Sequence, residues 1–96
     1  MPSYVTLFHW TEKGIRAVKD TTKRAAKFNE AIKKAGGRVH NVYWTMGPYD
    51  GVLIFDAPDD ETATAIMVSG GAQGNVRTMT MRAFDAAAMK KIVKKG

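Results

Sequence analysis

The spacing of hydrophobic and polar positions predicts four β-strands. In residues 3–10, Tyr4 and Phe8 point to one side while Val5 and Leu7 point to the other, which is the two-residue period of a strand. Similar apolar segments, set off by glycine and proline turn signals, predict strands over 38–46, 50–57 and 75–84. Both sides of the first and third strands carry apolar side chains, so we expect both faces of the sheet to be covered.

The second and third predicted strands are close enough in sequence to form a hairpin. Gly47-Pro48 supplies the turn signal between them. Strict alternation along 38–46 places Val39 on one side of the second strand and Val42 and Trp44 on the other.

Apolar residues at helical spacing predict a helix between the first two strands. A break at residues 20–22 offers a new N-cap, and Gly36-Gly37 is expected to end the helix. Phe28 and Ile32 belong to its apolar stripe. Arg24 lies at the edge of this stripe, where we expect its stem to cover apolar surface rather than to reach a ligand.

Two further helices follow the hairpin. One is predicted to begin at Pro58, with three acidic residues in its positive first turn, and to end at Gly70-Gly71. The other begins at Asp85 and carries Met89 and Ile92 on one side. We assign residues 1–85 to one domain and 86–96 to a basic C-terminal helix or tail.

The element order β-α-β-β-α-β predicts the fold. Two crossover units on one antiparallel sheet give an α+β, ferredoxin-like plait with four strands. Two helices can cover only one face of four strands, which leaves the other face apolar and exposed in a monomer. We therefore expect a homodimer formed through the sheet face, because homodimers are the commonest oligomers.

Length and composition exclude several classes of protein. The chain has 96 residues, enough for one domain, and no cysteine, so a disulfide scaffold, a thiol nucleophile and a thiolate metal site are excluded. No apolar run approaches the ~20 residues that span a bilayer, and residues 1–10 lack the features of a signal peptide. These absences predict a cytoplasmic protein with no membrane partner.

The chain is basic, with a formal charge of +6, and the charge is uneven. Residues 12–38 hold nine Lys and Arg against three Asp and Glu, whereas residues 50–61 hold five acidic residues and no basic one. A basic face attracts nucleic acid or anionic lipid. A lysine-rich helix face is more often simply solvated, and that is the interpretation we favour.

The residues Gly47-Pro48-Tyr49-Asp50 resemble the motif of the GYD domain family. The resemblance extends to Thr-x-x-Gly-Ile at residues 11–15, Ala-Pro-Asp-Asp-Glu-Thr at 57–62, and the segment from Gly74 to Phe84. It covers about residues 3–85. It implies a dimeric α/β barrel, in which two plaits pair their sheets, but it implies no particular reaction, because fold alone does not carry function.

Tyr49, Asp50 and Arg77 are the polar residues that we expect to cluster near the sheet. A functional role would have Asp50 act as a base and Tyr49 as a hydrogen-bond donor in a pocket. A structural role, which we favour, has Asp50 accept turn N–H groups or pair with an arginine. Arg77 and Arg82 fall on opposite faces of the last strand, and we expect one of them to pair with Asp50 or Asp56.

His9 and Trp44 complete the candidate residues. His9 is a possible general base. No carboxylate lies at a spacing typical of metal ligands from His9 or from the other histidine, His40, so we expect no metal site and no cofactor. Trp44 is a candidate wall for an aromatic ligand between sheet and helices, although core packing is the commoner role of such residues. The candidate ligand-binding residues are therefore Trp44, Tyr49, Asp50 and Arg77.

These observations predict a homodimer that is either a small-ligand-binding module or a cofactor-free enzyme. The ligand would be a small aromatic or anionic molecule. The alternatives are a nucleic-acid-binding protein and a purely structural or partner-binding dimer. RNA-binding plaits expose paired aromatic residues on their central strands, and the third strand, with Val52 to Phe55, lacks that signature.

Overall fold

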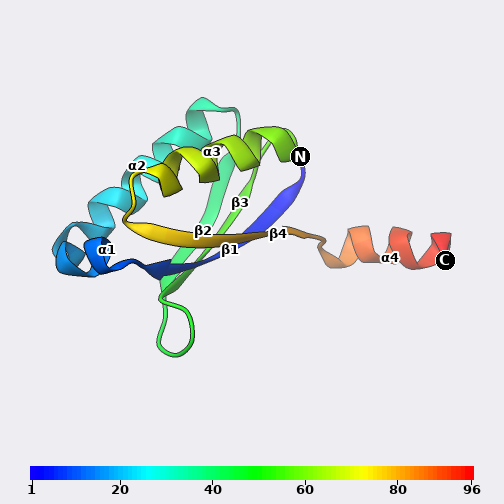
Figure 1. Ribbon diagram of the computed structural model, residues 1–96. Coiled ribbons are helices and arrows are strands. Elements are labelled where there is room, and N and C mark those ends of the chain that lie inside the picture. The colour runs from blue at the N-terminus through cyan, green and yellow to red at the C-terminus, as the bar shows by residue number, and fades with distance from the viewer.

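The computed structural model of the protein describes residues 1–96 and contains one four-stranded sheet with helices. Along the chain the elements are β1 (Ser3–Trp10), α1 (Glu12–Arg16), a 3₁₀ turn η1 (Val18–Asp20), α2 (Thr21–Lys34), β2 (Arg38–Trp44), β3 (Gly51–Asp56), α3 (Asp60–Ala72), β4 (Val76–Ala83) and α4 (Ala86–Lys95) (Figure 1). None of the helices is long and apolar enough to cross a membrane.

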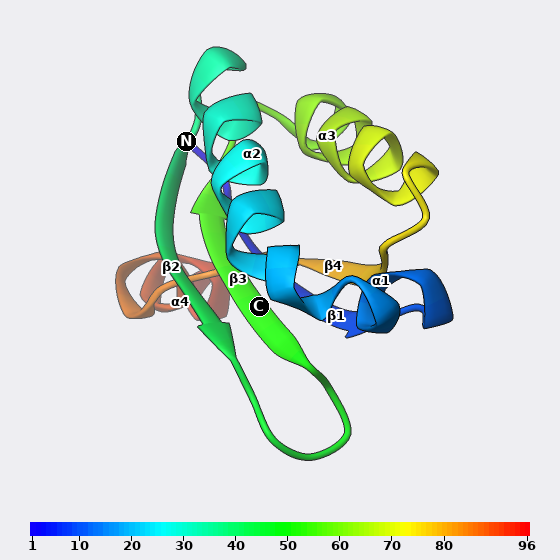
Figure 2. The same ribbon diagram turned by 90° about the vertical axis from the view of Figure 1, so that its left-hand side faces the viewer.

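The strands lie in the order β2-β3-β1-β4, and every neighbouring pair is antiparallel. Helices α2 and α3 lie on the same side of the sheet, with α2 against β2 and α3 against β4 (Figure 2). This arrangement confirms the predicted ferredoxin-like plait. The other side of the sheet, which we call the open face, has no helix over it (Figure 1).

The core lies between the sheet and the two helices. Phe55 and Ile32 are fully buried at its centre, and Tyr4 stacks on Phe55 with ring centroids 5.3 Å apart. The Tyr4 hydroxyl donates a hydrogen bond to Asp60 at the start of α3, over a distance of 2.5 Å. Burial, followed by this hydrogen bond, raises the pKa of Tyr4 to about 12. The Tyr4 side chain therefore stays neutral, and its hydrogen bond to Asp60 connects β1 to α3.

Apolar side chains form two cross-strand rows on the open face. One row joins Ile54, Val5 and Met81, and the other joins Val52, Leu7 and Met79. Met79 is 54% exposed and Met81 is 43% exposed. We call these six residues the open-face patch. Such a contiguous apolar surface is uncommon on a monomer.

Helix α3 does not end at Gly70-Gly71 as expected but continues to Ala72. Gly70 instead contacts α2, since a side chain at this position would overlap the ring of Phe28. Gly70 is therefore a packing residue within the helix. The chain turns at Gly74 instead, where φ is +81°. The helix begins at Asp60 rather than at Pro58, and the Asp59 carboxylate accepts the N–H of Thr62 as its N-cap.

Strand β2 departs from the strict alternation that the sequence predicts. The pairing with β3 shifts between Val39 and Asn41, so that one extra residue, His40, is accommodated as in a β-bulge. Val39 therefore packs against the core together with Val42 instead of lying opposite to it.

Helix α4 continues outward from the end of β4 and projects away from the rest of the molecule (Figure 1). The helix begins at Ala86, one residue after the predicted start at Asp85, and Asp85 caps it by accepting the N–H of Ala88. One of its sides carries Met89 and Ile92, which are 43% and 39% exposed. These apolar side chains have no partner within the chain's own core.

Candidate functional site

A cavity of about 280 Å³ lies between the helix-covered face of the sheet and the two helices. Its walls are mainly apolar, because the core-facing side chains of the strands and of both helices line it. The wall residues include Phe8, Val42 and Leu53 from the strands and Phe28, Ile66 and Met67 from the helices. Exposed Lys27 and Ser69 line the cavity from the two helices, which places its mouth between them.

The hydroxyl of Thr21 is the best-defined polar group of this cavity. Thr21 begins α2, and its Oγ1 accepts the indole N–H of Trp44 at 3.0 Å and that of Trp10 at 3.3 Å. A hydroxyl oxygen has two acceptor positions and one proton to donate. With both acceptor positions taken, the remaining capacity of Thr21 is to donate.

Arg24 lies one helical turn beyond Thr21 and also lines the cavity. Its guanidinium donates to the carbonyl oxygen of Ala17 at 2.9 Å and to that of Gly14 at 3.3 Å. No carboxylate lies within 4.0 Å of it. The expectation that Arg24 only covers apolar surface is therefore incomplete, because two backbone carbonyls also hold its charged head in place.

Asp50 lies outside the cavity, where it joins the end of β1 to the start of β3. Its Oδ2 accepts the backbone N–H of Trp10 at 2.9 Å, and its own N–H donates to the carbonyl of Phe8 at 2.9 Å. The preceding loop turns at Gly47, where φ is +103°, a conformation that favours glycine. Asp50 directly precedes β3. Its carboxylate thus gives the N–H of Trp10 the acceptor that a strand carbonyl would otherwise supply.

Tyr49, His9 and Arg77 meet at one end of the open face. The rings of Tyr49 and His9 lie 4.9 Å apart between centroids, and His9 pairs in register with Arg77. Arg77 forms no ion pair. Of the four predicted ligand-binding residues, only Trp44 lines the cavity, and the expected cluster of Tyr49, Asp50 and Arg77 contains no hydrogen bond or ion pair among its members.

The predicted pairing of an arginine with Asp50 or Asp56 is wrong. Arg82 lies on the helix-covered side, with its guanidinium 5.8 Å from the centroid of the Tyr4 ring and 3.9 Å from a carboxylate oxygen of Asp60. Asp56 pairs with His40 instead. Tyr4 is paired in register with Arg82 and donates a hydrogen bond to Asp60 at the start of α3. This places the Asp60 carboxylate near Arg82.

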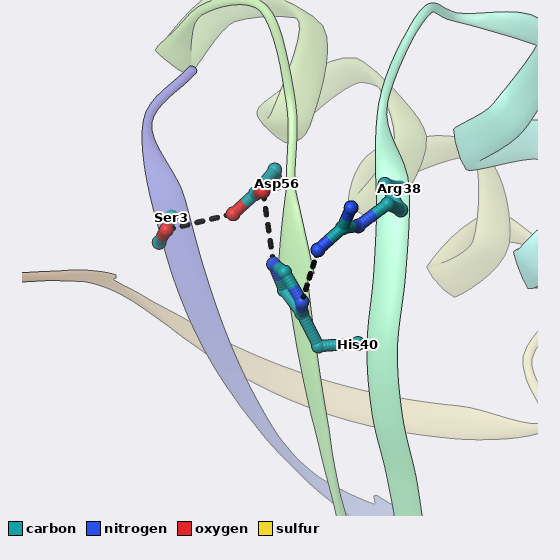
Figure 3. Close-up of polar contacts among 4 residues, drawn as sticks. All are labelled: Ser3, Arg38, His40 and Asp56. Atoms are coloured by element: carbon teal, nitrogen blue, oxygen red, sulfur yellow. Dashed lines mark hydrogen bonds and ion pairs between the residues drawn. The ribbon is translucent and has the colours of Figure 1, made fainter. Parts of the chain in front are cut away.

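A second polar cluster lies at the opposite end of the open face and was not predicted from the sequence (Figure 3). The Asp56 carboxylate accepts from the hydroxyl of Ser3 at 2.7 Å and lies 2.9 Å from Nε2 of His40. Arg38 contacts the other ring nitrogen, Nδ1, at 3.2 Å. The bulge in β2 brings His40 to Asp56, so strand alternation alone gave no signal for this contact.

Burial raises the pKa of Asp56, but the hydrogen bonds from Ser3 and His40 and the charges around it outweigh that effect, so the net pKa lies below its ordinary value. Ser3 bonds to the carboxylate and not to His40, so the order of contacts differs from that of a hydrolase triad, in which the histidine lies between the other two. No group of three metal-ligating side chains occurs here or elsewhere in the structure.

Comparison with known proteins identifies relatives by sequence and by fold. The profile of the GYD domain family matches residues 4–93, a range that includes most of α4. The protein of Thermus thermophilus named glutamine synthetase and cystathionine beta-lyase binding protein is 31% identical over 88 residues, which are 91% of this chain and 93% of that protein.

Solved structures extend the comparison to the fold. A crystal structure of a Thermus thermophilus protein is similar with a TM-score of 0.55 at 27% identity, over 90% of this chain and 96% of that one. The feast or famine regulatory protein of M. tuberculosis, complexed with L-methionine, has a TM-score of 0.67 at 15% identity, over 90% of this chain and 52% of that one. The second likeness shows only a shared fold.

Asp50→Ala should lower the free energy of unfolding by about 1–3 kcal/mol, because the backbone N–H of Trp10 loses an ionised acceptor. Asp50→Asn keeps an oxygen at the same position and should cost less. Urea denaturation of both variants measures this difference. Equal losses for the two substitutions would show that the acceptor at Trp10 contributes nothing.

The Asp56 cluster should make the protein sensitive to acid. Because the folded pKa lies below the ordinary value of 3.8, the ionised carboxylate stabilises the fold at higher pH, and this contribution disappears as the pH falls through the folded pKa. The stability difference between wild type and Asp56→Asn should therefore shrink between about pH 5 and pH 2. Ser3→Ala, which removes a bond that lowers the pKa, should move this loss to higher pH. A difference that does not change with pH in denaturation curves would contradict the assignment.

Proposed function

The chain belongs to the GYD domain family, and from this premise we propose that it is a homodimeric module that binds a small ligand in the cavity of each protomer. The observation that carries the proposal is the cavity itself. Ligand sites are mostly apolar, with a few polar groups that set orientation, and measure ~300–1,000 Å³. A cavity of about 280 Å³ with Thr21 and Arg24 in a mainly apolar lining corresponds to the small end of this range.

The open-face patch supports the homodimer. Its six aliphatic and methionine side chains span β3, β1 and β4 without a covering element. A second copy offers an identical apolar surface, and a two-fold axis lets the same patch cover itself. Methionine adapts its shape to a partner surface, which suits the exposed Met79 and Met81 to such a contact.

Dimerisation through the open face and ligand binding are compatible in one assembly. The open-face patch and the cavity lie on opposite sides of the sheet, and the cavity opens between α2 and α3. Covering the patch therefore leaves both cavities accessible. A dimer of this form would present two equivalent ligand sites.

A second candidate function is docking onto a metabolic enzyme, and the printed name of the Thermus thermophilus relative favours it. Helix α4 offers a suitable element, since exposed Met89, Ile92 and Val93 accompany four lysines on a short helix. An amphipathic helix binds by placing its apolar side in a groove. The partner that fits is an enzyme with an apolar groove bordered by acidic side chains.

Blocking the cavity should abolish ligand binding. Ala25 lines the cavity from α2, whereas its exposed neighbour Ala26 does not, so Ala25→Trp fills the space and Ala26→Trp is the matched control. In ligand-observed NMR with a panel of small aromatic and aliphatic acids, amides and amines, wild type and Ala26→Trp should bind at least one class that Ala25→Trp does not.

Circular dichroism checks that the blocked variant is folded, and Ala65→Trp on α3 provides a second block from the opposite wall. Absence of binding by the wild type to the whole panel would refute the ligand-binding function. Equal binding by wild type and both blocked variants would place the ligand elsewhere.

The homodimer should dissociate when a charge enters the open-face patch. Met79→Asp puts two carboxylates, one from each copy, into an apolar interface, which costs several kcal/mol when they have no partner. Native mass spectrometry should show a dimer for wild type and a monomer for Met79→Asp. Val68→Asp is the control, because Val68 is 66% exposed on α3, away from the open face. A monomeric wild type, or a dimeric Met79→Asp variant, would contradict the sheet-to-sheet arrangement.

A further inference from the structure

We infer that the cavity takes a small apolar monocarboxylate whose carboxylate binds to Arg24 and to the hydroxyl of Thr21. This inference rests on the proposed function, since it names the class of ligand for the same cavity. Three features of the cavity carry it: the donor that Thr21 has left, the unpaired charge of Arg24 and the absence of acidic residues from the lining.

Thr21 requires an acceptor from the ligand. Its oxygen accepts from both indoles, so its proton is the only hydrogen-bonding capacity that remains. The two indole N–H groups also hold the hydroxyl in place, because Trp10 and Trp44 approach it from different strands. A ligand oxygen that accepts a hydrogen bond from the Thr21 hydroxyl completes this arrangement, whereas an ammonium group would face a donor.

The charge of Arg24 favours a ligand whose acceptor group is negative. A guanidinium has five N–H donors, and two of its bonds go to the carbonyls of Ala17 and Gly14. Donors are left over, and the charge has no carboxylate within 4.0 Å. Arginine binds carboxylates through strong, charge-assisted hydrogen bonds. The half-buried position of Arg24 reduces the screening of its charge by water.

The lining as a whole has the same preference. Its only ionisable side chains are Arg24 and Lys27, both basic, and it contains no Asp or Glu. Lys27 is exposed at the rim, so a single arginine provides the inner charge. A dianion such as a phosphate ester carries two negative charges, and the single inner arginine balances only one of them. The apolar walls formed by Phe8, Phe28 and Ile66 suit a hydrocarbon body.

The test compares three probes of one shape, 3-phenylpropionate, 3-phenylpropionamide and 3-phenylpropylamine, by titration calorimetry and NMR at constant ionic strength. Wild type should bind the acid about 10–100-fold more tightly than the amide, and the amine least. Arg24→Gln should remove most of this preference, and Arg24→Lys should keep part of it. Lys23→Gln, which removes a charge from the exposed surface of α2 outside the cavity, should leave the preference nearly intact.

Thr21 is tested by a matched pair of substitutions. Thr21→Ser keeps the hydroxyl and should retain binding of the acid, whereas Thr21→Val removes it and should weaken binding. Because Thr21→Val also leaves two indoles without an acceptor, its melting temperature is measured beside that of Thr21→Ser. If Thr21→Val does not fold, the Arg24 variants decide the outcome.

The outcomes separate the ligand class from the function. Equal binding of acid and amide by wild type, blocked in both cases by Ala25→Trp, would overturn the carboxylate assignment and leave the ligand-binding function standing. An acid preference that survives Arg24→Gln would also overturn the assignment. A wild type that binds neither these probes nor any member of the wider panel would refute the proposed function itself.

Discussion

A four-stranded sheet with apolar residues on both faces cannot be covered by two helices, and the rest of the structure depends on this imbalance. Helices α2 and α3 occupy one side only, where they bury Phe55 and Ile32. The other side keeps six apolar residues in two cross-strand rows. The hydrophobic effect is proportional to apolar area removed from water, so the open side is the place where association gains most.

The helix-covered side has its own constraint, which is the distance between α2 and α3. Phe28 of α2 packs on Gly70, where no side chain intervenes, and this contact lets the helices approach each other near the end of α3. Elsewhere the layer holds a cavity lined by Phe8, Ile66 and other apolar side chains. Protein interiors are normally close-packed, so a space of this size beside a fixed arginine and a fixed hydroxyl is a specific feature of the layer.

Local patterns predicted most of the fold because strand and helix periods are properties of consecutive residues. The period of two in β1 and the acidic residues at the start of α3 are of this kind. The bulge in β2 and the passage of α3 through Gly70 escaped prediction, because each depends on a neighbour distant in sequence. Trp44 was identified as a candidate wall of a ligand pocket from its position on a strand. Thr21 was not identified, since its role arises only when two indoles from separate strands meet its hydroxyl.

The Asp50 carboxylate connects the motif of the family to the cavity without touching it. Asp50 holds the backbone N–H of Trp10, and the indole of the same residue donates to Thr21 at the start of α2. Trp44, on the neighbouring hairpin, reaches the same hydroxyl. The turn at Gly47 and the carboxylate at Asp50 thus fix the ends of β1 and β2 relative to the first turn of α2. In the ligand site that we propose, the motif on the loop would act as a positioning element, because the geometry of a ligand contact depends on the rigidity of the residues behind it.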